Sequence, residues 1–300
     1  MSRPLRVATR GSALARWQAE RVVARLGVPA ELEIVTTRAD RDSTTAIHAM
    51  GGTGVFVKEV QDAVLRGDAD LAVHSAKDLP AQTPPGLTLV AVPERADPRD
   101  ALVGAALDDI PTGGRVGSGS VRRRAQLASL RPDLTFGELR GNIATRLERA
   151  AGFDAIVVAV AALARLGLED RVAEVLPTNG VLPQVGQGAL AVECRADDDA
   201  TRAALFAIDD PGAHTAVRAE RAFLAELGGG CNLPCGALAT VAVGADGDEA
   251  VTIEGLLASL DGRVVLRARE TGANPEAAGA RVARALLDDR GGSALMDEVA

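Results

Sequence analysis

Two groups of arginines stand next to glycine-containing turns, where their side chains could bind an anionic ligand. In the first group, the Gly/Ser loop at residues 117–120 leads directly into Arg122 and Arg123. In the second group, Arg140 precedes a glycine and Arg146 follows in the next helical segment. A helix N-terminus attracts anions, and guanidinium groups bind carboxylates or phosphates bidentately. These residues predict a small polyanionic ligand, with a solvated basic surface as the alternative.

A lysine and an aspartate stand side by side after an apolar segment. Residues 69–74 are mostly apolar, and Lys77 and Asp78 follow them. Lys58 and Lys77 are the only lysines of the chain, so arginine supplies nearly every other cation. An ammonium and a guanidinium are not interchangeable at a tight site. Lys77 is therefore a candidate anion anchor and Asp78 a candidate partner for a cationic or N–H group; a surface ion pair is the alternative.

The cysteines favour a covalent role over a metal site. Cys231 and Cys235 lie in a glycine-containing loop, whereas Cys194 lies in an apolar segment. A zinc site needs about four ligands, and the histidines are scattered, so we expect no metal. The loop thiols are either small buried hydrophobic groups or, if exposed, able to carry a covalent adduct. An odd number of cysteines without an export signal indicates reduced thiols in the cytoplasm.

The composition excludes several classes of protein. Hydrophobic residues make up 47% and charged residues 25%, as in a soluble globular protein. The net charge of −8 and the single tryptophan argue against a nucleic-acid-binding protein. The longest apolar run, residues 155–164, is about half the ~20 residues that span a bilayer. We therefore expect neither a membrane anchor nor a signal peptide.

The elements that must position these residues alternate between strand and helix, which predicts sheets with right-handed parallel crossovers. In the first unit the expected strands are residues 5–9, 31–37 and 69–74, and the expected helices are residues 13–26, capped by Ser12, and 57–66. The glycine-rich stretch at residues 51–54 predicts a mobile loop.

A proline-rich segment at residues 93–98 predicts a hinge before a second α/β unit. Its expected strands are residues 115–117, 134–139 and 154–160, and its expected helices are residues 121–130, 142–150 and 161–166. Ligands bind at the carboxyl ends of the strands in open α/β sheets, so both arginine groups would line one cleft. A further strand at residues 189–194 is expected to cross back to the first unit.

After about residue 210 the pattern becomes that of a small α+β domain. The expected helices are residues 214–227 and 275–287, and the expected strands are residues 238–243, 251–259 and 263–269, with a hairpin turn at Asp261 and Gly262. We therefore expect three domains: residues 1–95 with 190–208, residues 96–189, and residues 209–300.

Taken together, these motifs resemble those of the porphobilinogen deaminase family, also called hydroxymethylbilane synthases. The matching segments run in order along nearly the whole chain: residues 9–12 and 17–19, 54–59, 74–80, 118–123, 139–147, 186–195 and 229–231. The sequence departs from the family pattern at Thr53, where a lysine is frequent, and at Gly119 and Ala76.

The resemblance implies a monomer with two lobes like those of periplasmic binding proteins and a small third domain. It implies a cytoplasmic transferase of porphyrin, tetrapyrrole and heme biosynthesis. Such an enzyme condenses four porphobilinogen molecules head to tail into hydroxymethylbilane and releases four ammonia. The chain grows on a dipyrromethane cofactor that a thioether fixes to the cysteine at the position of Cys231, and water then releases the tetrapyrrole.

The resemblance also implies roles for single residues. Asp78 is the expected catalytic carboxylate, and Lys58 belongs to the lid. The residues expected to hold the cofactor besides Cys231 are Lys77, Asp78, Ser120, Arg122, Arg123 and Arg146. The residues expected to hold the incoming ring are Arg10, Ser12, Arg140, Arg146 and Arg165.

Two alternatives stay open at this point. A two-lobed solute-binding protein without enzymatic activity would explain the sheets and arginines, but it would not need Cys231 or a third domain. A nucleic-acid-binding protein would use the arginines at residues 122–124. As a partner, the resemblance suggests a hand-over of product to uroporphyrinogen-III synthase.

Overall fold

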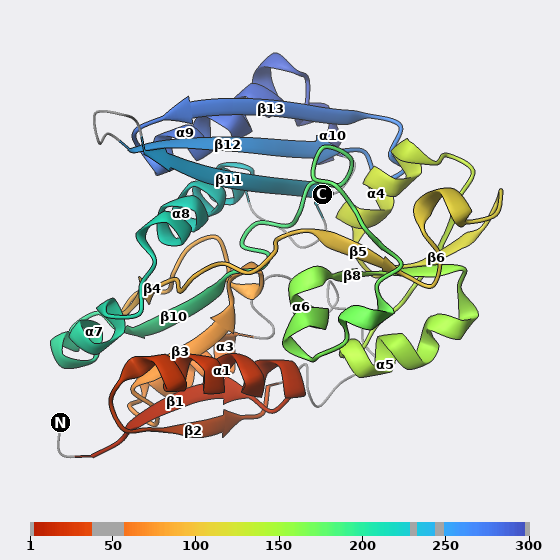
Figure 1. The fold of residues 1–300 in the computed structure, drawn as a ribbon. Helices are drawn as coiled ribbons and strands as arrows, with labels where there is room; N and C mark the ends of the chain where they lie inside the picture. The colour runs from red at the N-terminus through yellow and green to blue at the C-terminus, as the bar shows by residue number, and fades with distance from the viewer. Residues whose placement is uncertain (1–2, 38–56, 229–232, 244–248, 298–300) are drawn as a thin grey trace.

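The fold consists of two α/β lobes and a three-stranded sheet that packs with two helices (Figure 1). The computed structural model describes residues 3–37, 57–228, 233–243 and 249–297. The glycine-rich loop, Thr53 and Cys231 lie outside the described residues. Within the described part of the chain, no helix has the length and apolarity needed to span a membrane.

The first lobe is built on a five-stranded sheet. Its order is β2-β1-β3-β10-β4, with the strands β1 (Leu5–Arg10), β2 (Ala30–Val35), β3 (Leu71–Ser75), β4 (Leu87–Ala91) and β10 (Leu190–Arg195). β1 runs parallel to β2 and β3, whereas β10 runs antiparallel to β3 and β4. The predicted return of residues 189–194 to the first unit is therefore confirmed.

Helices cover both faces of this sheet, because successive side chains of a strand point to opposite faces. Val7 packs with α1 (Ala13–Leu26) and α7 (Asp199–Phe206) on one face. Its neighbour Ala8 packs with α3 (Lys58–Leu65) on the other face.

The second lobe repeats this architecture. Its sheet has the order β7-β6-β8-β5-β9, with the strands β5 (Asp100–Val103), β6 (Arg115–Gly117), β7 (Thr135–Gly137), β8 (Ala155–Ala159) and β9 (Glu174–Val175). β6 is parallel to β7 and β8, and β5 is the antiparallel strand. α4 (Val121–Leu130) covers one face, and α5 (Ile143–Glu148) and α6 (Val160–Arg165) cover the other. The α/β class with a parallel pairing at the heart of each lobe is confirmed.

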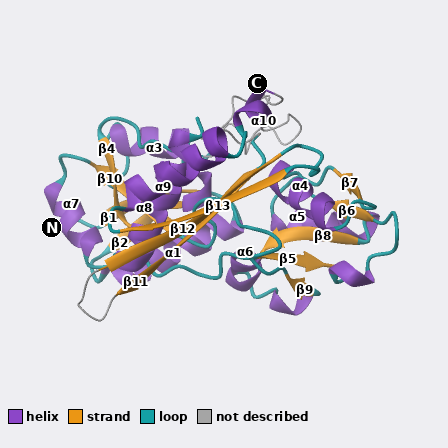
Figure 2. Ribbon diagram, turned by 90° about the horizontal axis from the view of Figure 1, so that it is seen from above, coloured by secondary structure: helices purple, strands orange, loops and turns teal. Residues whose placement is uncertain are grey.

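The third unit is the antiparallel sheet β11 (Cys235–Val243), β12 (Glu249–Ala258) and β13 (Val265–Gly272). α8 (Pro211–Glu226) and α9 (Pro275–Arg284) pack on it around the buried Phe223, and the short α10 (Ser293–Asp297) follows. A side chain at Gly279 would collide with the carbonyl oxygen of Ala219, so glycine allows α8 and α9 to approach closely. Figure 1 shows this sheet above the two lobes, and Figure 2 shows it from above, extending across the first lobe towards α4 of the second lobe.

Candidate active site

The first lobe contributes the residues that follow two neighbouring strands. Arg10 ends β1, and Ser12 caps α1 by accepting a hydrogen bond from the N–H of Ala15 at 3.3 Å. β3 ends at Ser75, and a single 3₁₀ turn over Ala76–Asp78 follows it. A cavity of about 60 Å³ is lined by Arg10, Ser12 and Asp78, among others. The structure thus brings together three of the residues singled out from the sequence.

The second lobe holds Arg122 and Arg123 on a buried carboxylate, Asp100. Asp100 is the first residue of β5 and is completely buried. One carboxylate oxygen accepts from Arg122 Nη2 at 2.8 Å, and the other accepts from Arg123 Nη2 at 2.6 Å. Burial alone would raise the pKa of Asp100, but the two guanidinium groups outweigh it and hold this pKa well below its usual range. The anion between the first-turn arginines is therefore supplied by the chain itself.

Lys77 has a different environment. Its ammonium group donates a weak hydrogen bond to Oε1 of Gln187 at 3.3 Å, and no carboxylate of the described residues forms an ion pair with it. Burial and then the charge of Arg123 lower the pKa of Lys77 to about 8, although Asp78 and Asp100 oppose this shift. Lys77 is therefore a buried cation whose charge no ion pair with a described carboxylate neutralises.

Gln187 joins the two lobes at this point. Its amide Nε2 donates to Asp100 Oδ1 at 2.8 Å and to the carbonyl of Pro98 at 2.7 Å, while its Oε1 faces Lys77. Lys77 of the first lobe and Asp100 of the second lobe are thus linked through one side chain. Lys77, Asp78, Asp100, Arg123 and Arg146 influence one another electrostatically; together with Arg122 we call these residues the charge cluster.

Arg140 and Arg146, the second arginine group, have different environments. Arg146 donates from Nε to the carbonyl of Gly141 at 2.8 Å. Burial and the charge of Arg123 lower the pKa of Arg146 to about 10, against the opposing charge of Asp78. Arg140 instead bonds Glu138 at 2.9 Å, on the carboxylate that also accepts from Arg124. Arg146 therefore belongs to the charge cluster, whereas Arg140 forms an ion pair with Glu138.

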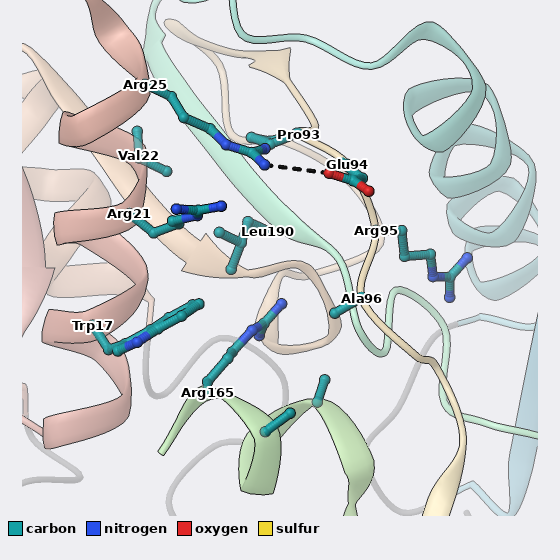
Figure 3. A pocket seen from close by; sticks show the side chains of 12 residues that line it. Trp17, Arg21, Val22, Arg25, Pro93, Glu94, Arg95, Ala96, Arg165 and Leu190 are labelled. Atoms are coloured by element: carbon teal, nitrogen blue, oxygen red, sulfur yellow. Dashed lines mark hydrogen bonds and ion pairs between the residues drawn. The ribbon is translucent and has the colours of Figure 1, made fainter. Parts of the chain in front are cut away.

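Arg165 lies apart from these residues. Its Nη2 donates to the carbonyl of Gly188 at 2.7 Å, and its guanidinium stands 5.9 Å from the centre of the Trp17 ring. It lines a second cavity, of about 290 Å³, between α1 and α6 (Figure 3). The structure does not bring Arg165 into the cavity of Arg10 and Asp78.

Among the remaining residues, Ser120 caps α4 by accepting from the N–H of Arg123 at 3.4 Å. Lys58 is exposed at the first residue of α3. Cys235 is buried at the start of β11, and Cys194 is buried in β10, where burial raises the pKa of its thiol to about 11. Neither described cysteine is an exposed thiol. Among the described residues, no three His, Cys, Asp or Glu side chains form a group that could hold a metal ion.

Sequence reasoning missed Asp100 as a functional residue. It lies 22 positions from Arg122 in the chain, and only the pairing of β5 with β8 brings it under α4. The sequence does contain one sign of this residue's role: Asp100 directly precedes the apolar residues 101–103, where a buried strand would begin.

The charge cluster suits a ligand that carries carboxylates. Lys77, Arg122, Arg123 and Arg146 bring four positive charges, and Asp78 and Asp100 bring two negative ones, which leaves the cluster cationic. Nε of Arg122 is buried without a hydrogen-bond partner in the described structure. Buried donors of this kind bind an acceptor from a ligand favourably.

Comparisons with known proteins cover almost the whole chain. The family model described as "Porphobilinogen deaminase, dipyromethane cofactor binding domain" matches residues 5–203, and "Porphobilinogen deaminase, C-terminal domain" matches residues 214–288. A porphobilinogen deaminase of Roseiflexus castenholzii is 46% identical, with 99% of each chain covered. One of Brevibacillus brevis is 43% identical over 97% of this chain and 96% of the relative.

Solved structures of lower similarity were also found. The BvgS VFT2 domain of Bordetella pertussis is 16% identical, with a TM-score of 0.40 over 68% of this chain and 85% of that domain. A TRAP periplasmic solute-binding protein of Desulfovibrio salexigens is 13% identical, with a TM-score of 0.41 over 70% of this chain and 73% of that protein.

Proposed function

This chain belongs to the porphobilinogen deaminase family, and we propose which of its residues carry out the reaction of that family. The chain is a transferase that assembles hydroxymethylbilane from four porphobilinogen molecules with the release of ammonia, and its cofactor is a dipyrromethane. The single observation that carries the residue assignment is the cationic charge cluster at the junction of the lobes.

The cluster matches the chemistry of the ligands. Each pyrrole ring of the substrate bears an acetate and a propionate group, so a chain of rings is polyanionic. Lys77, Arg123 and Arg146 would bind carboxylates of the cofactor, with Nε of Arg122 as a further donor and Ser120 at the N-terminus of α4. Each charge-assisted bond would contribute about 1.5–3 kcal/mol. We propose Cys231, outside the described residues, as the site of covalent attachment; the buried Cys235 is a less suitable nucleophile.

The incoming ring would lie on the side of the first lobe. Arg10 and Ser12 line the same cavity as Asp78, which supports their assignment to the substrate. Arg140 would bind the ring after exchanging Glu138 for a substrate carboxylate. Lys58, at the start of α3, would act from the lid. The assignment of Arg165 to the ring rests on the resemblance alone, since this residue lines the other cavity.

Asp78 is the proposed catalytic residue. When ammonia leaves the aminomethyl group of the substrate, positive charge develops on the pyrrole nitrogen. A fixed carboxylate directed at that nitrogen stabilises this charge in the transition state. The 3₁₀ turn Ala76–Asp78 holds the Asp78 backbone directly after the buried β3. The cofactor would supply the free α-carbon to which the first new ring is joined.

The remaining assignments concern the whole protein. We propose that it acts as a monomer in the cytoplasm and hands its product to uroporphyrinogen-III synthase. We also propose domain limits at residues 95/96, 189/190 and 208/209. The pairing of β10 with β3 and β4 supports the inclusion of residues 190–208 in the first domain.

Replacement of Asp78 tests the catalytic assignment. Asp78→Asn keeps the size of the side chain and removes its charge, so turnover is expected to fall by about 10³-fold or more. Turnover is measured per chain that carries pyrrole, and denaturant unfolding checks that the fold is retained. The matched control is Asp68→Asn, which removes an exposed carboxylate on the same lobe. Near-normal turnover of Asp78→Asn would remove Asp78 from the mechanism.

A further inference from the structure

Gln187 lies on one of the two segments that cross between the lobes, and its side chain is completely buried. Its carbonyl oxygen accepts a hydrogen bond at 2.9 Å from Nε of Arg95, which lies on the other crossing segment. A side chain at the preceding Gly186 would lie 2.9 Å from the backbone nitrogen of Lys77. The backbone that carries Gln187 is therefore packed closely against the turn that carries Lys77.

The contacts of the Gln187 amide group fix its orientation. Nε2 donates to Oδ1 of Asp100 at 2.8 Å and to the carbonyl oxygen of Pro98 at 2.7 Å. Both of these oxygens can only accept hydrogen bonds, so the amide nitrogen must face them. The amide oxygen is thereby turned towards the ammonium of Lys77, at 3.3 Å. A buried carboxylate of the second lobe thus ensures that an acceptor, and not a donor, faces the lysine of the first lobe.

The charge of Lys77 depends on a small set of groups. Among the described residues, the amide oxygen is the only acceptor of a hydrogen bond from its ammonium. Burial, Arg123 and Arg146 favour the neutral amine, whereas Asp78 and Asp100 favour the ammonium. These opposing effects leave the pKa of Lys77 at about 8. A hydrogen bond to the charged form therefore changes how much of this lysine is charged at slightly alkaline pH.

We propose that Gln187 is a positioning residue for the reaction: its amide oxygen keeps Lys77 charged and holds the ammonium at a fixed distance from Asp100. Asp100 in turn fixes Arg123, so a lysine of the first lobe and an arginine of the second lobe keep one spacing. A polyanion between the lobes can then contact two cations that are already in place. The inference rests on the proposed function for the identity of that polyanion, the dipyrromethane.

The chain itself simplifies the test, because Lys58 and Lys77 are its only lysines. Lys77 is largely buried but keeps some contact with solvent, and Lys58 is exposed. Acetic anhydride reacts with the neutral amine, so the rate of acetylation against pH gives a titration midpoint for each lysine. Peptide mass analysis separates the two lysines. The full chain with Cys231→Ser is used, after its intact mass has shown that no pyrrole is bound.

Gln187→Met keeps the length of the side chain and removes its acceptor. The midpoint of Lys77 should fall from about 8 by about half a pH unit or more, because the charged form loses its hydrogen bond. The midpoint of Lys58 should not change. A purely structural role of Gln187 predicts the opposite sign, since a loosened junction would admit water and raise the Lys77 midpoint towards 10.5.

Two further variants isolate the amide oxygen. Gln184→Met is the matched control, because Gln184 donates to the backbone carbonyl of Lys77, at 3.2 Å, and does not contact its ammonium. The Lys77 midpoint should stay unchanged in this variant. Gln187→Glu keeps an oxygen towards Lys77 and loses the donor to Asp100, so the midpoint should stay at about 8 or rise. Chemical denaturation checks the fold of each variant, and Gln187→Glu carries the test if Gln187→Met does not fold.

Cofactor loading separates this inference from the proposed function. With Cys231 intact, Gln187→Met should load pyrrole at pH 8.5 more slowly than the unaltered chain, by about twofold or more, because less Lys77 is charged. A lowered midpoint with equal loading would contradict Lys77 as a ligand of the cofactor, and the effect of Gln187 on its charge would stand.

Three results would overturn the role of Gln187 itself. The first is an unchanged or raised Lys77 midpoint in folded Gln187→Met. The second is a lowered midpoint in Gln187→Glu, and the third is an equal fall in Gln184→Met.

Discussion

At the scale of single residues, the partner of each cation decides what that cation can do. Arg122 and Arg123 share the carboxylate of Asp100, so their positions are fixed before any ligand arrives. Among the described residues, the ammonium of Lys77 donates a hydrogen bond only to the amide oxygen of Gln187. A pre-organised pair of arginines and an under-compensated lysine form a site whose charge a polyanionic ligand completes.

The pH dependence of stability follows from Lys77. Its pKa is about 8 in the folded chain and 10.5 ordinarily, so the folded chain loses this proton first as the pH rises. The free energy of unfolding contributed by Lys77 should therefore rise between about pH 8 and 10.5, and this gain is lost as the pH falls through 8.

The measurement compares denaturant unfolding across this pH range in two cofactor-free chains. One carries Cys231→Ser alone, and the other carries Cys231→Ser with Lys77→Met. Between about pH 8 and 10.5 the free energy of unfolding should rise more steeply in the chain that retains Lys77 than in the chain with Lys77→Met, because Arg146 and Arg165, whose pKa values are lowered to about 10, titrate in both. An identical pH dependence of the two chains would show that burial does not lower the pKa of Lys77.

At the scale of elements, the sequence was most informative where a helix has clear ends. α1 and α4 were predicted with the bounds that the structure has, because Ser12 and the Gly/Ser loop mark their starts. β4, β5 and β9 were missed; β5 begins with a buried charge that interrupts its apolar pattern, and β9 has only two residues. The site residues that follow the ends of predicted strands could therefore be found from the sequence. Asp100 could not, because only the pairing of strands in the sheet brings it beneath α4.

Asp100 should be the main determinant of the geometry of α4. Asp100→Asn leaves the guanidinium groups of Arg122 and Arg123 buried without a counter-charge, which is expected to cost about 3–5 kcal/mol of unfolding free energy. Chemical denaturation measures this loss. Asp97→Asn is the matched control, because the ion pair of Asp97 with Arg99 is partly exposed to solvent, unlike the buried Asp100, and should contribute less than about 1 kcal/mol. Equal effects of the two substitutions would contradict a structural role for the buried carboxylate.

At the scale of the whole molecule, one buried carboxylate connects the third unit to the junction of the lobes. Glu220 of α8 accepts from Arg95 at 2.6 Å, from the N–H of Gly186 at 2.7 Å and from the N–H of Ala239 at 2.9 Å. Arg95 and Gly186 lie on the two segments that cross between the lobes, and Ala239 lies on β11. The β11–β13 sheet is thereby fixed to the segments that cross between the lobes.

Glu220→Gln should loosen this connection. The substitution leaves Arg95 without its counter-charge, so the free energy of unfolding is expected to fall by about 3–5 kcal/mol. α8 and β11–β13 should become sensitive to protease before the two lobes do. Limited proteolysis followed by mass analysis detects the order of cleavage. Glu276→Gln, which removes an exposed partner of Arg218, serves as the control. Simultaneous cleavage of all three units in Glu220→Gln would contradict the role of this carboxylate as a connector.

The proposed attachment of the dipyrromethane at Cys231 connects all three scales, because it would place a polyanion from the third unit in the charge cluster between the lobes. The most direct test is the intact mass of the purified chain under denaturing conditions, beside that of Cys231→Ser. An excess equal to two linked pyrrole rings is expected in the unaltered chain and absent in the variant. A bare mass that persists after incubation with porphobilinogen, or pyrrole retained by Cys231→Ser, would contradict attachment at Cys231.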